Sequence, residues 1–315
     1  MKIFVYLSIS AAVLAAVPSA HALQINGYDS GRHDRFISGY PGDPVANPDF
    51  FAAGYDWSGV GWDAANDSRS IALVSPLHFV CAHHYEIPTG NTVTFLNRDG
   101  ELKSYTIAGY SNFSFTDSDG AHVSDLSLGR LSAAVAEADN IAYYPVLNAD
   151  NESTPAFEGD WYAGKEIISY GWTARAGTNA IDSLGFVSTN STQDPDNLTF
   201  SAVSDFHSGS SLYPDEAGLE GGDSGSPSFM VWNDQLTLMG THFAVGSGTT
   251  LSYNVDAFLP YYIDNVNSAM SGSGYALATI NVVPEPSSLL YFVLGMFGMF
   301  GLNGSRRKRK SAAEN

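Results

Sequence analysis

The chain has 315 residues, and its 33 acidic and 14 basic side chains give a formal charge of −19. This charge disfavours binding to nucleic acid or to an anionic membrane surface, because both need basic patches. Cys81 is the only cysteine, which excludes an intrachain disulfide, so the fold must be stabilised by its hydrophobic core.

The first 22 residues have the pattern of a secretory signal peptide. Lys2 supplies a positive start, residues 3–17 are mostly apolar, and Ala-His-Ala at 20–22 is an A-x-A cleavage signal. We therefore expect signal peptidase to cut after Ala22 and the protein to be exported. A buried N-terminal helix is the alternative, but it does not account for all three features together.

Short strands separated by turns are expected from Trp57 onward, after a stretch at 23–56 whose Gly, Asp, Asn and Pro predict a loop. Segments 70–75, 79–82, 92–96, 102–109 and 126–131 would form a first β-barrel within about 55–140. An acidic connector at 132–160 leads to a second barrel at about 160–257, with strands at 165–172, 228–232, 235–240 and 251–256. A short C-terminal helix is expected at about 258–270.

Residues 221–227 read Gly-Gly-Asp-Ser-Gly-Ser-Pro, which places the Ser224 hydroxyl between glycines. Glycine permits a tight turn and close approach of a second molecule, so backbone N–H groups beside Ser224 would be free to hold an oxyanion. A serine is a weak nucleophile and needs an oriented base. His84 follows Phe-Val-Cys-Ala-His at 79–83, and Asp125 precedes Leu-Ser-Leu-Gly at 126–129.

These three stretches resemble the His, Asp and Ser motifs of the trypsin-like (chymotrypsin-fold) serine peptidases, in that family's order. The resemblance implies an all-β fold of two six-stranded antiparallel barrels with a short C-terminal helix. It also implies that Ser224 attacks a peptide carbonyl, His84 acts as general base and Asp125 holds the imidazole. The N–H groups of Gly222 and Ser224 would form the oxyanion hole.

The same resemblance implies protein or peptide substrates and no metal or organic cofactor. His83 stands where the family prefers a small residue, so it is an alternative base, but the preceding Leu-Val-Ser-Pro at 73–76 aligns His84 with the family histidine. His83, His84 and His122, together with Asp117 and Asp119, match no tight metal-ligand spacing, and we predict no metal site there. Cys81 is expected to be a small buried filler.

Specificity and activation are open at this point. Gly218, six residues before Ser224, lacks the carboxylate that selects Arg or Lys in the family. His242 falls where glutamate-specific relatives carry a histidine, which favours an acidic P1 residue; the alternative is a packed strand histidine.

Ile37-Ser-Gly-Tyr resembles the new N-terminus of activated relatives, whose amine would pair with Asp223; the alternative is a surface loop, with Asp223 satisfied by another partner.

The tail at 283–315 resembles a PEP-CTERM sorting signal of Gram-negative bacteria. It has Pro-Glu-Pro at 284–286, an apolar segment at 289–302 and a basic cluster at 306–310. The resemblance implies transient insertion into the inner membrane, processing by an exosortase-type enzyme, and release to the cell envelope surface or exterior. The apolar segment is shorter than the about 20 residues of a relaxed transmembrane helix, although a permanent anchor is the alternative.

Two functions remain open from the sequence. The first is an exported serine endopeptidase that works through an acyl-enzyme. The second is a catalytically silent surface or biofilm-matrix protein that uses a peptidase scaffold for binding. The complete Ser, His and Asp set favours the first.

Overall fold

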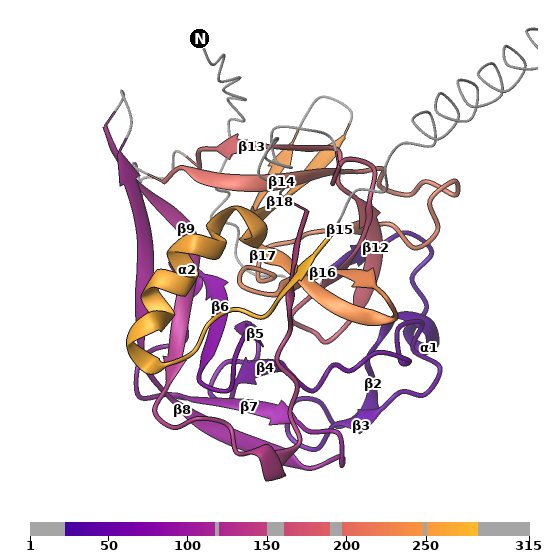
Figure 1. The fold of residues 1–315 in the computed structure, drawn as a ribbon. Coiled ribbons are helices and arrows are strands. Elements are labelled where there is room, and N and C mark those ends of the chain that lie inside the picture. The colour runs from indigo at the N-terminus through magenta and orange to yellow at the C-terminus, as the bar shows by residue number, and fades with distance from the viewer. Residues whose placement is uncertain (1–22, 117–119, 150–160, 190–196, 248–250, 283–315) are drawn as a thin grey trace, which may run out of the picture.

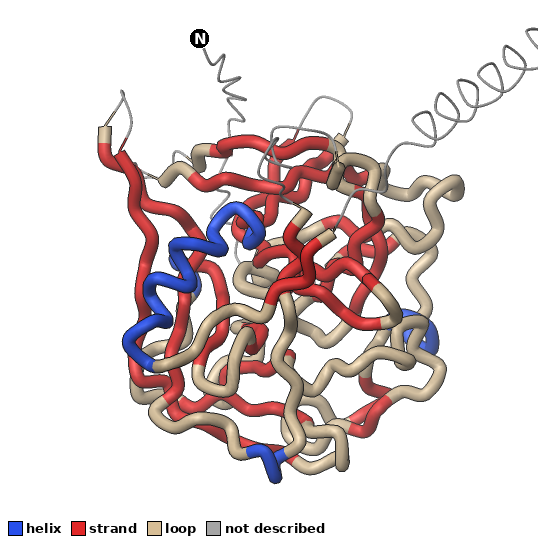
Figure 2. Tube along the Cα trace, viewed as in Figure 1, coloured by secondary structure: helices blue, strands red, loops and turns tan. Residues whose placement is uncertain are grey.

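The computed structural model describes residues 23–116, 120–149, 161–189, 197–247 and 251–282. The predicted signal peptide, the sorting tail and the acidic residues at 117 and 119 lie outside these ranges. Strands dominate the described chain, and Figure 2 shows them in red, with few helical segments. Among the described residues, no helix combines the length and apolarity needed to cross a membrane.

Six strands close into the first barrel, in the order β4-β5-β6-β9-β8-β7. Their bounds are β4 (Val60–Asp63), β5 (Ser70–Leu73), β6 (His78–Ala82), β7 (Thr92–Leu96), β8 (Leu102–Thr116) and β9 (Ala121–Leu131). The interior is filled by Ile71, Phe79 and Phe95, each with no exposed surface. Alternating apolar residues in these segments face this interior. Five of the six strands overlap the predicted segments, whereas β4 was not among them.

The second unit is a curved nine-stranded sheet. Seven strands follow one path: β12 (Ala176–Ala180), β11 (Glu166–Tyr170), β16 (Pro227–Trp232), β17 (Gln235–Ser247), β18 (Ser252–Phe258), β14 (Thr199–Phe206) and β13 (Ser183–Val187). Two short strands, β10 (Val146–Asn148) and β19 (Thr279–Asn281), join it in parallel through β17. It therefore has more strands than the six expected, and its described strands do not close into a complete ring.

A C-terminal helix follows the last long strand, as predicted. A 3₁₀ turn (Leu259–Tyr262) leads into α2 (Ile263–Met270), which buries Val266 and Met270. The Tyr262 ring stacks on Phe113 of β8, so this segment packs against the first barrel (Figure 1). Further 3₁₀ turns span His83–Tyr85, Glu137–Asp139 and Ser271–Ser273. The chymotrypsin-type all-β architecture with a short C-terminal helix is confirmed.

The stretch at 23–56 differs from the predicted loop. It contains β1 (Gln24–Ile25), α1 (Ser30–His33), β2 (Phe36–Ser38) and β3 (Val45–Ala46). β1 pairs with β15 (Ala217–Gly218), which lies just before the Ser224 turn. The reason is hydrophobic: Leu23 and Ile25 pack with Ala217 and Leu219 in a separate small core.

Candidate active site

Three separate elements bring His84, Asp125 and Ser224 together. His84 lies in the 3₁₀ turn that follows β6, and Asp125 lies on β9. Because β6 and β9 pair with Ala82 opposite Leu126, His84 emerges beside Asp125. Ser224 comes from the turn between β15 and β16 of the second unit, so the site lies where the two units meet.

The three side chains form a continuous hydrogen-bonded chain. His84 Nδ1 lies 2.7 Å from Asp125 Oδ2, and His84 Nε2 lies 3.0 Å from Ser224 Oγ. The backbone N–H of His84 also donates to Asp125 Oδ1 at 2.9 Å. Asp125 is 2% exposed, whereas the His84 side chain is 39% exposed. A buried carboxylate thus orients an imidazole whose other nitrogen accepts from an accessible hydroxyl.

The neighbouring histidine points elsewhere. His83 Nδ1 lies 3.1 Å from Glu86 Oε1, and Glu86 in turn accepts from Ser127 Oγ at 2.7 Å. Of the two candidate bases, the structure places only His84 between Asp125 and Ser224.

Two backbone N–H groups beside Ser224 have the arrangement expected of an oxyanion hole. Within the described chain, the N–H groups of Gly222 and Ser224 have no acceptor, whereas Asp223 donates to Glu220 O and Gly225 to His242 O. Gly222 has φ +110°, and a Cβ there would lie 2.9 Å from Trp172 Nε1. Glycine is therefore required at 222 for both conformation and space.

Asp223, which precedes Ser224, points inward. It is 1% exposed and accepts N–H groups from Trp172 at 3.2 Å and Glu220 at 2.9 Å. Burial raises the pKa of its carboxyl to about 6, although the Glu220 N–H bond acts in the opposite direction. A buried carboxylate of this kind is stabilised by a nearby cation.

In the uncleaved chain, Ile37 lies within β2 and its side chain is 62% exposed, so no contact with Asp223 supports the hypothesis of a paired N-terminus at Ile37. Leu23 is the apolar residue near Asp223. It is completely buried, and a Cβ placed on Gly171 would lie 2.7 Å from both Leu23 Cβ and Asp223 Oδ1. The sequence signal that we overlooked is that Leu23 directly follows the predicted cleavage site.

The two proposed specificity residues are both enclosed. Gly218 is packed under Phe206, whose Cδ1 would lie 2.4 Å from a Cβ at 218. His242 is 1% exposed; its Nδ1 bonds to Asp256 and its Nε2 lies 3.1 Å from Tyr170 O. Burial alone would lower the pKa of His242, but the Asp256 carboxylate raises it overall. With both ring nitrogens engaged, His242 is a packed strand histidine, and its predicted contact with an acidic substrate side chain is not supported.

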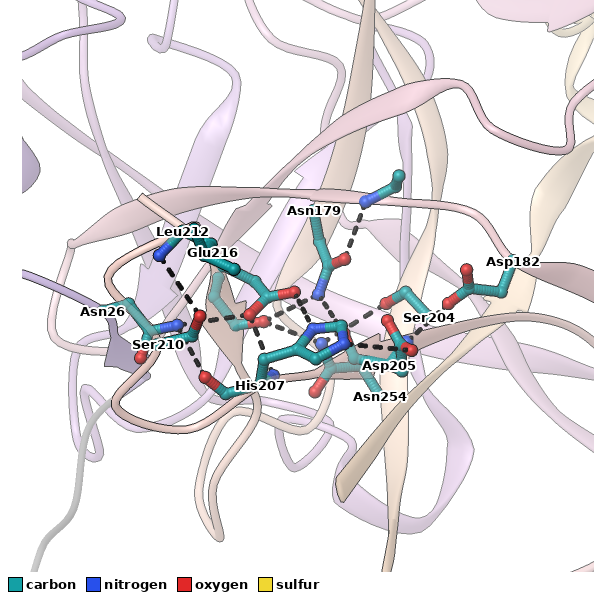
Figure 3. A network of polar contacts seen from close by, with 12 residues as sticks. Asn26, Asn179, Asp182, Ser204, Asp205, His207, Ser210, Leu212, Glu216 and Asn254 are labelled. Atoms are coloured by element: carbon teal, nitrogen blue, oxygen red, sulfur yellow. Dashed lines mark hydrogen bonds and ion pairs between the residues drawn. The ribbon is translucent and has the colours of Figure 1, made fainter. Parts of the chain in front are cut away.

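Among the described residues, one group has ligand atoms close enough to hold a metal ion: Asp205, His207 and Glu216. Figure 3 shows them within a wider polar network. Glu216 Oε1 lies 2.8 Å from His207 Nδ1, and Glu216 Oε2 accepts N–H groups from His207 and from Asn26. The hydrogen bond to Glu216 raises the pKa of His207. These contacts explain the group as an ion pair between His207, just after β14, and Glu216, just before β15, with a further hydrogen bond from Asn26 after β1.

Comparison with known proteins gives a fold-level likeness. No protein-family model matches the sequence, and no curated protein matches it. A mutant of human heparin binding protein (CAP37) is 13% identical, covering 70% of this chain and 95% of that chain, with a TM-score of 0.46. Kallikrein-related peptidase 10 is 14% identical over 67% of this chain and 93% of its own, with a TM-score of 0.43.

The NS6 protease from murine norovirus 1 is 16% identical, covers 64% of this chain and 90% of its own, and has a TM-score of 0.39. Such identities and scores give no basis for inferring an activity. The function must therefore be argued from the geometry around Ser224.

Proposed function

We propose that this protein is a serine endopeptidase. The observation that carries the proposal is the single line of contacts from buried Asp125 through His84 to the accessible Ser224 hydroxyl. The free N–H groups of Gly222 and Ser224 lie on the same turn. A base, its orienting group, a nucleophile and an oxyanion site are the four parts that acyl transfer requires.

Hydrolysis would proceed in two stages. Ser224 Oγ attacks the substrate carbonyl while its proton passes to His84 Nε2, and Asp125 stabilises the resulting imidazolium. The oxyanion accepts from the Gly222 and Ser224 N–H groups. His84 then gives the proton to the leaving amine, which leaves an acyl-enzyme. Water, deprotonated by His84, attacks the acyl group, and the proton returns to Ser224 as the product acid leaves.

The proposal includes the maturation route. Cleavage of the signal peptide after Ala22 would create an α-amine on Leu23, a buried residue that lies beside Asp223. That amine would supply a full positive charge beside the Asp223 carboxylate, in addition to the influence of His242. Export would then complete the site without a separate zymogen cleavage, since β1 already holds Gln24 against Gly218. It is a second candidate for the N-terminus that pairs with Asp223, besides the one considered at Ile37.

Export by a Gram-negative cell, with processing of the tail by an exosortase-type enzyme and release at the envelope or outside, remains part of the proposal. It rests on the sequence at 1–22 and 283–315. Proteins and peptides are the proposed substrates. We do not propose a preference for acidic P1 residues, because the nitrogens of His242 are already bonded.

The deciding experiment compares the protein that begins at Leu23 with its Ser224→Ala variant on a mixed peptide library, with cut sites read by mass spectrometry. We expect cleavage by the parent and none by Ser224→Ala. Ser226→Ala is a matched control, because Ser226 is buried on the same turn and outside the His84 chain. Absence of cleavage in all three folded proteins would favour the binding-scaffold alternative.

A further inference from the structure

A cavity of about 410 Å³ lies away from the catalytic residues. Its lining comes from Arg35 and the start of β2, from β3, from the segment 47–58, and from the end of β7 with the following turn. Figure 1 labels these three strands. None of His84, Asp125 or Ser224 lines it. Any role of this cavity therefore differs from the proposed chemistry at Ser224.

Arg35 in this cavity carries a buried charge that has no carboxylate partner among the described residues. It is only 6% exposed. Among the described residues, its side chain makes two long hydrogen bonds, both donated by Nη1: one of 3.4 Å to Val60 O and one of 3.4 Å to Tyr170 Oη. Its guanidinium also lies over the Phe36 ring, 4.7 Å from the centroid. A buried guanidinium with so few partners is costly, since buried charges are normally paired.

The remaining donors of Arg35, Nε and Nη2, have no hydrogen-bond partner among the described residues. Because Arg35 lines the cavity, these two donors are candidates for contact with a ligand bound there. Two adjacent guanidinium N–H groups of this kind match the two oxygens of a carboxylate.

The other lining residues narrow the chemistry of the ligand. The charged ones are Arg35, Arg98 and Asp56, and Arg98 is already ion-paired with Asp56. The cavity thus keeps one net positive charge in a chain whose formal charge is −19. Its walls include the aromatic side chains of Phe36, Phe50, Tyr55 and Trp57. Such walls suit an aromatic or apolar body attached to the anion.

We propose that this cavity, named the Arg35 pocket, binds the carboxylate of an aromatic or apolar molecule. The carboxylate would bond to Nε and Nη2 of Arg35, and the apolar body would lie against the aromatic walls. A small aryl carboxylate and the free C-terminus of a peptide share this chemistry. The inference does not depend on peptidase activity, because its test measures binding alone.

Isothermal titration calorimetry of the protein that begins at Leu23 tests the pocket with 3-phenylpropanoate and with the matched neutral 3-phenylpropanamide. We expect saturable one-to-one binding of the carboxylate and at least tenfold weaker binding of the amide. Arg35→Met should lose at least tenfold in affinity, whereas Arg130→Met, an exposed arginine on β9 outside the pocket, should bind as the parent does.

Arg35 is buried, so Arg35→Met could fail to fold. Gly54→Phe provides the second variant, because Gly54 lines the pocket and a Cβ there meets no atom within 4 Å. This variant keeps Arg35, fills space in the pocket, and should also weaken binding at least tenfold. Parental affinity in Gly54→Phe, equal binding of carboxylate and amide, or absence of binding to the parent would each overturn the proposal.

A second titration distinguishes the two ligand sources. It uses the Ser224→Ala protein, which prevents turnover, and measures binding of a tetrapeptide that ends in phenylalanine and of the same peptide with a C-terminal amide. Tighter binding of the free peptide acid than of 3-phenylpropanoate would assign the pocket to peptide C-termini. Equal or weaker binding of the peptide would assign it to small aryl carboxylates. Either result requires that the amide form of the preferred ligand binds less well.

Discussion

Asp125 shows how a single buried residue orients the histidine beside Ser224. Its two carboxylate oxygens accept from the backbone N–H and from Nδ1 of His84. The Asp125 N–H in turn donates to Thr199 Oγ1 of β14, so the second unit helps to hold the carboxylate. This double contact holds the imidazole with its Nε2 lone pair toward Ser224.

We predict that Asp125→Asn lowers kcat by roughly 10⁴-fold and leaves KM within a few-fold, because an amide can stabilise the wrong imidazole tautomer. Steady-state kinetics on a peptide found in the library screen would measure both constants. Asp205→Asn, a partly exposed change on β14, is the control. A kcat close to that of the parent would contradict the assigned role of Asp125.

The N-terminal strand is the element on which activity should depend most. β1 is only two residues long, yet it fixes Leu23 beside the Asp223 carboxylate through pairing with β15. One extra residue would replace the α-amine by a neutral amide. We predict that a chain retaining Ala22 loses at least tenfold in kcat/KM relative to the chain that begins at Leu23.

The pH dependence of stability follows from Asp223. Without the amine, burial raises its pKa to about 6 from 3.8. Below about pH 4 the buried carboxyl is protonated and contributes fully to the free energy of unfolding. As the pH rises through 6 the carboxyl ionises, and the free energy of unfolding falls by about 3 kcal/mol. The chain that begins at Leu23 recovers this loss by pairing its amine with the carboxylate. The recovery in turn fades when the amine deprotonates, above about pH 8.

Thermal unfolding of the two forms between pH 4 and 9 would check this reasoning. The Tm difference should be small at pH 4, largest near pH 7, and smaller again at pH 9. Asp223→Asn should remove most of the difference, because an amide side chain does not depend on a cation. Equal Tm values and equal activity at pH 7 would show that Leu23 needs no free amine.

At the scale of the whole molecule, features set by local sequence pattern could be predicted, whereas features set by long-range packing could not. The first barrel and the surroundings of Ser224 were predictable, because alternation and glycine-rich turns are local signals. β1 was not, since its two residues have meaning only against β15. The burial of His242 likewise depends on Asp256 and Tyr170, whose proximity no local pattern indicates. The unpaired charge of Arg35 also becomes visible only when the surrounding segments are assembled.

The absence of an intrachain disulfide makes hydrophobic packing the source of stability, and Cys81, in the core of the first barrel, can report on that packing. Cys81 is 1% exposed on β6, and burial raises the pKa of its thiol well above the ordinary value. It also packs close to the nucleophile turn: a Cβ at Gly225 would lie 3.6 Å from Cys81 Cβ. The native thiol should therefore be both shielded and protonated, which makes it inert toward thiol reagents.

We predict that labelling of Cys81 at pH 7.5 follows global unfolding: it should be slow in native buffer and complete within the dead time in denaturant. Mass spectrometry of quenched samples would measure the rate, and added reductant should leave Tm unchanged. Leu212→Cys in a Cys81→Ala background is the matched control, because Leu212 is 81% exposed and should label at once. Native labelling of Cys81 at a comparable rate would mean that the first barrel opens locally beside Ser224, without unfolding of the second unit.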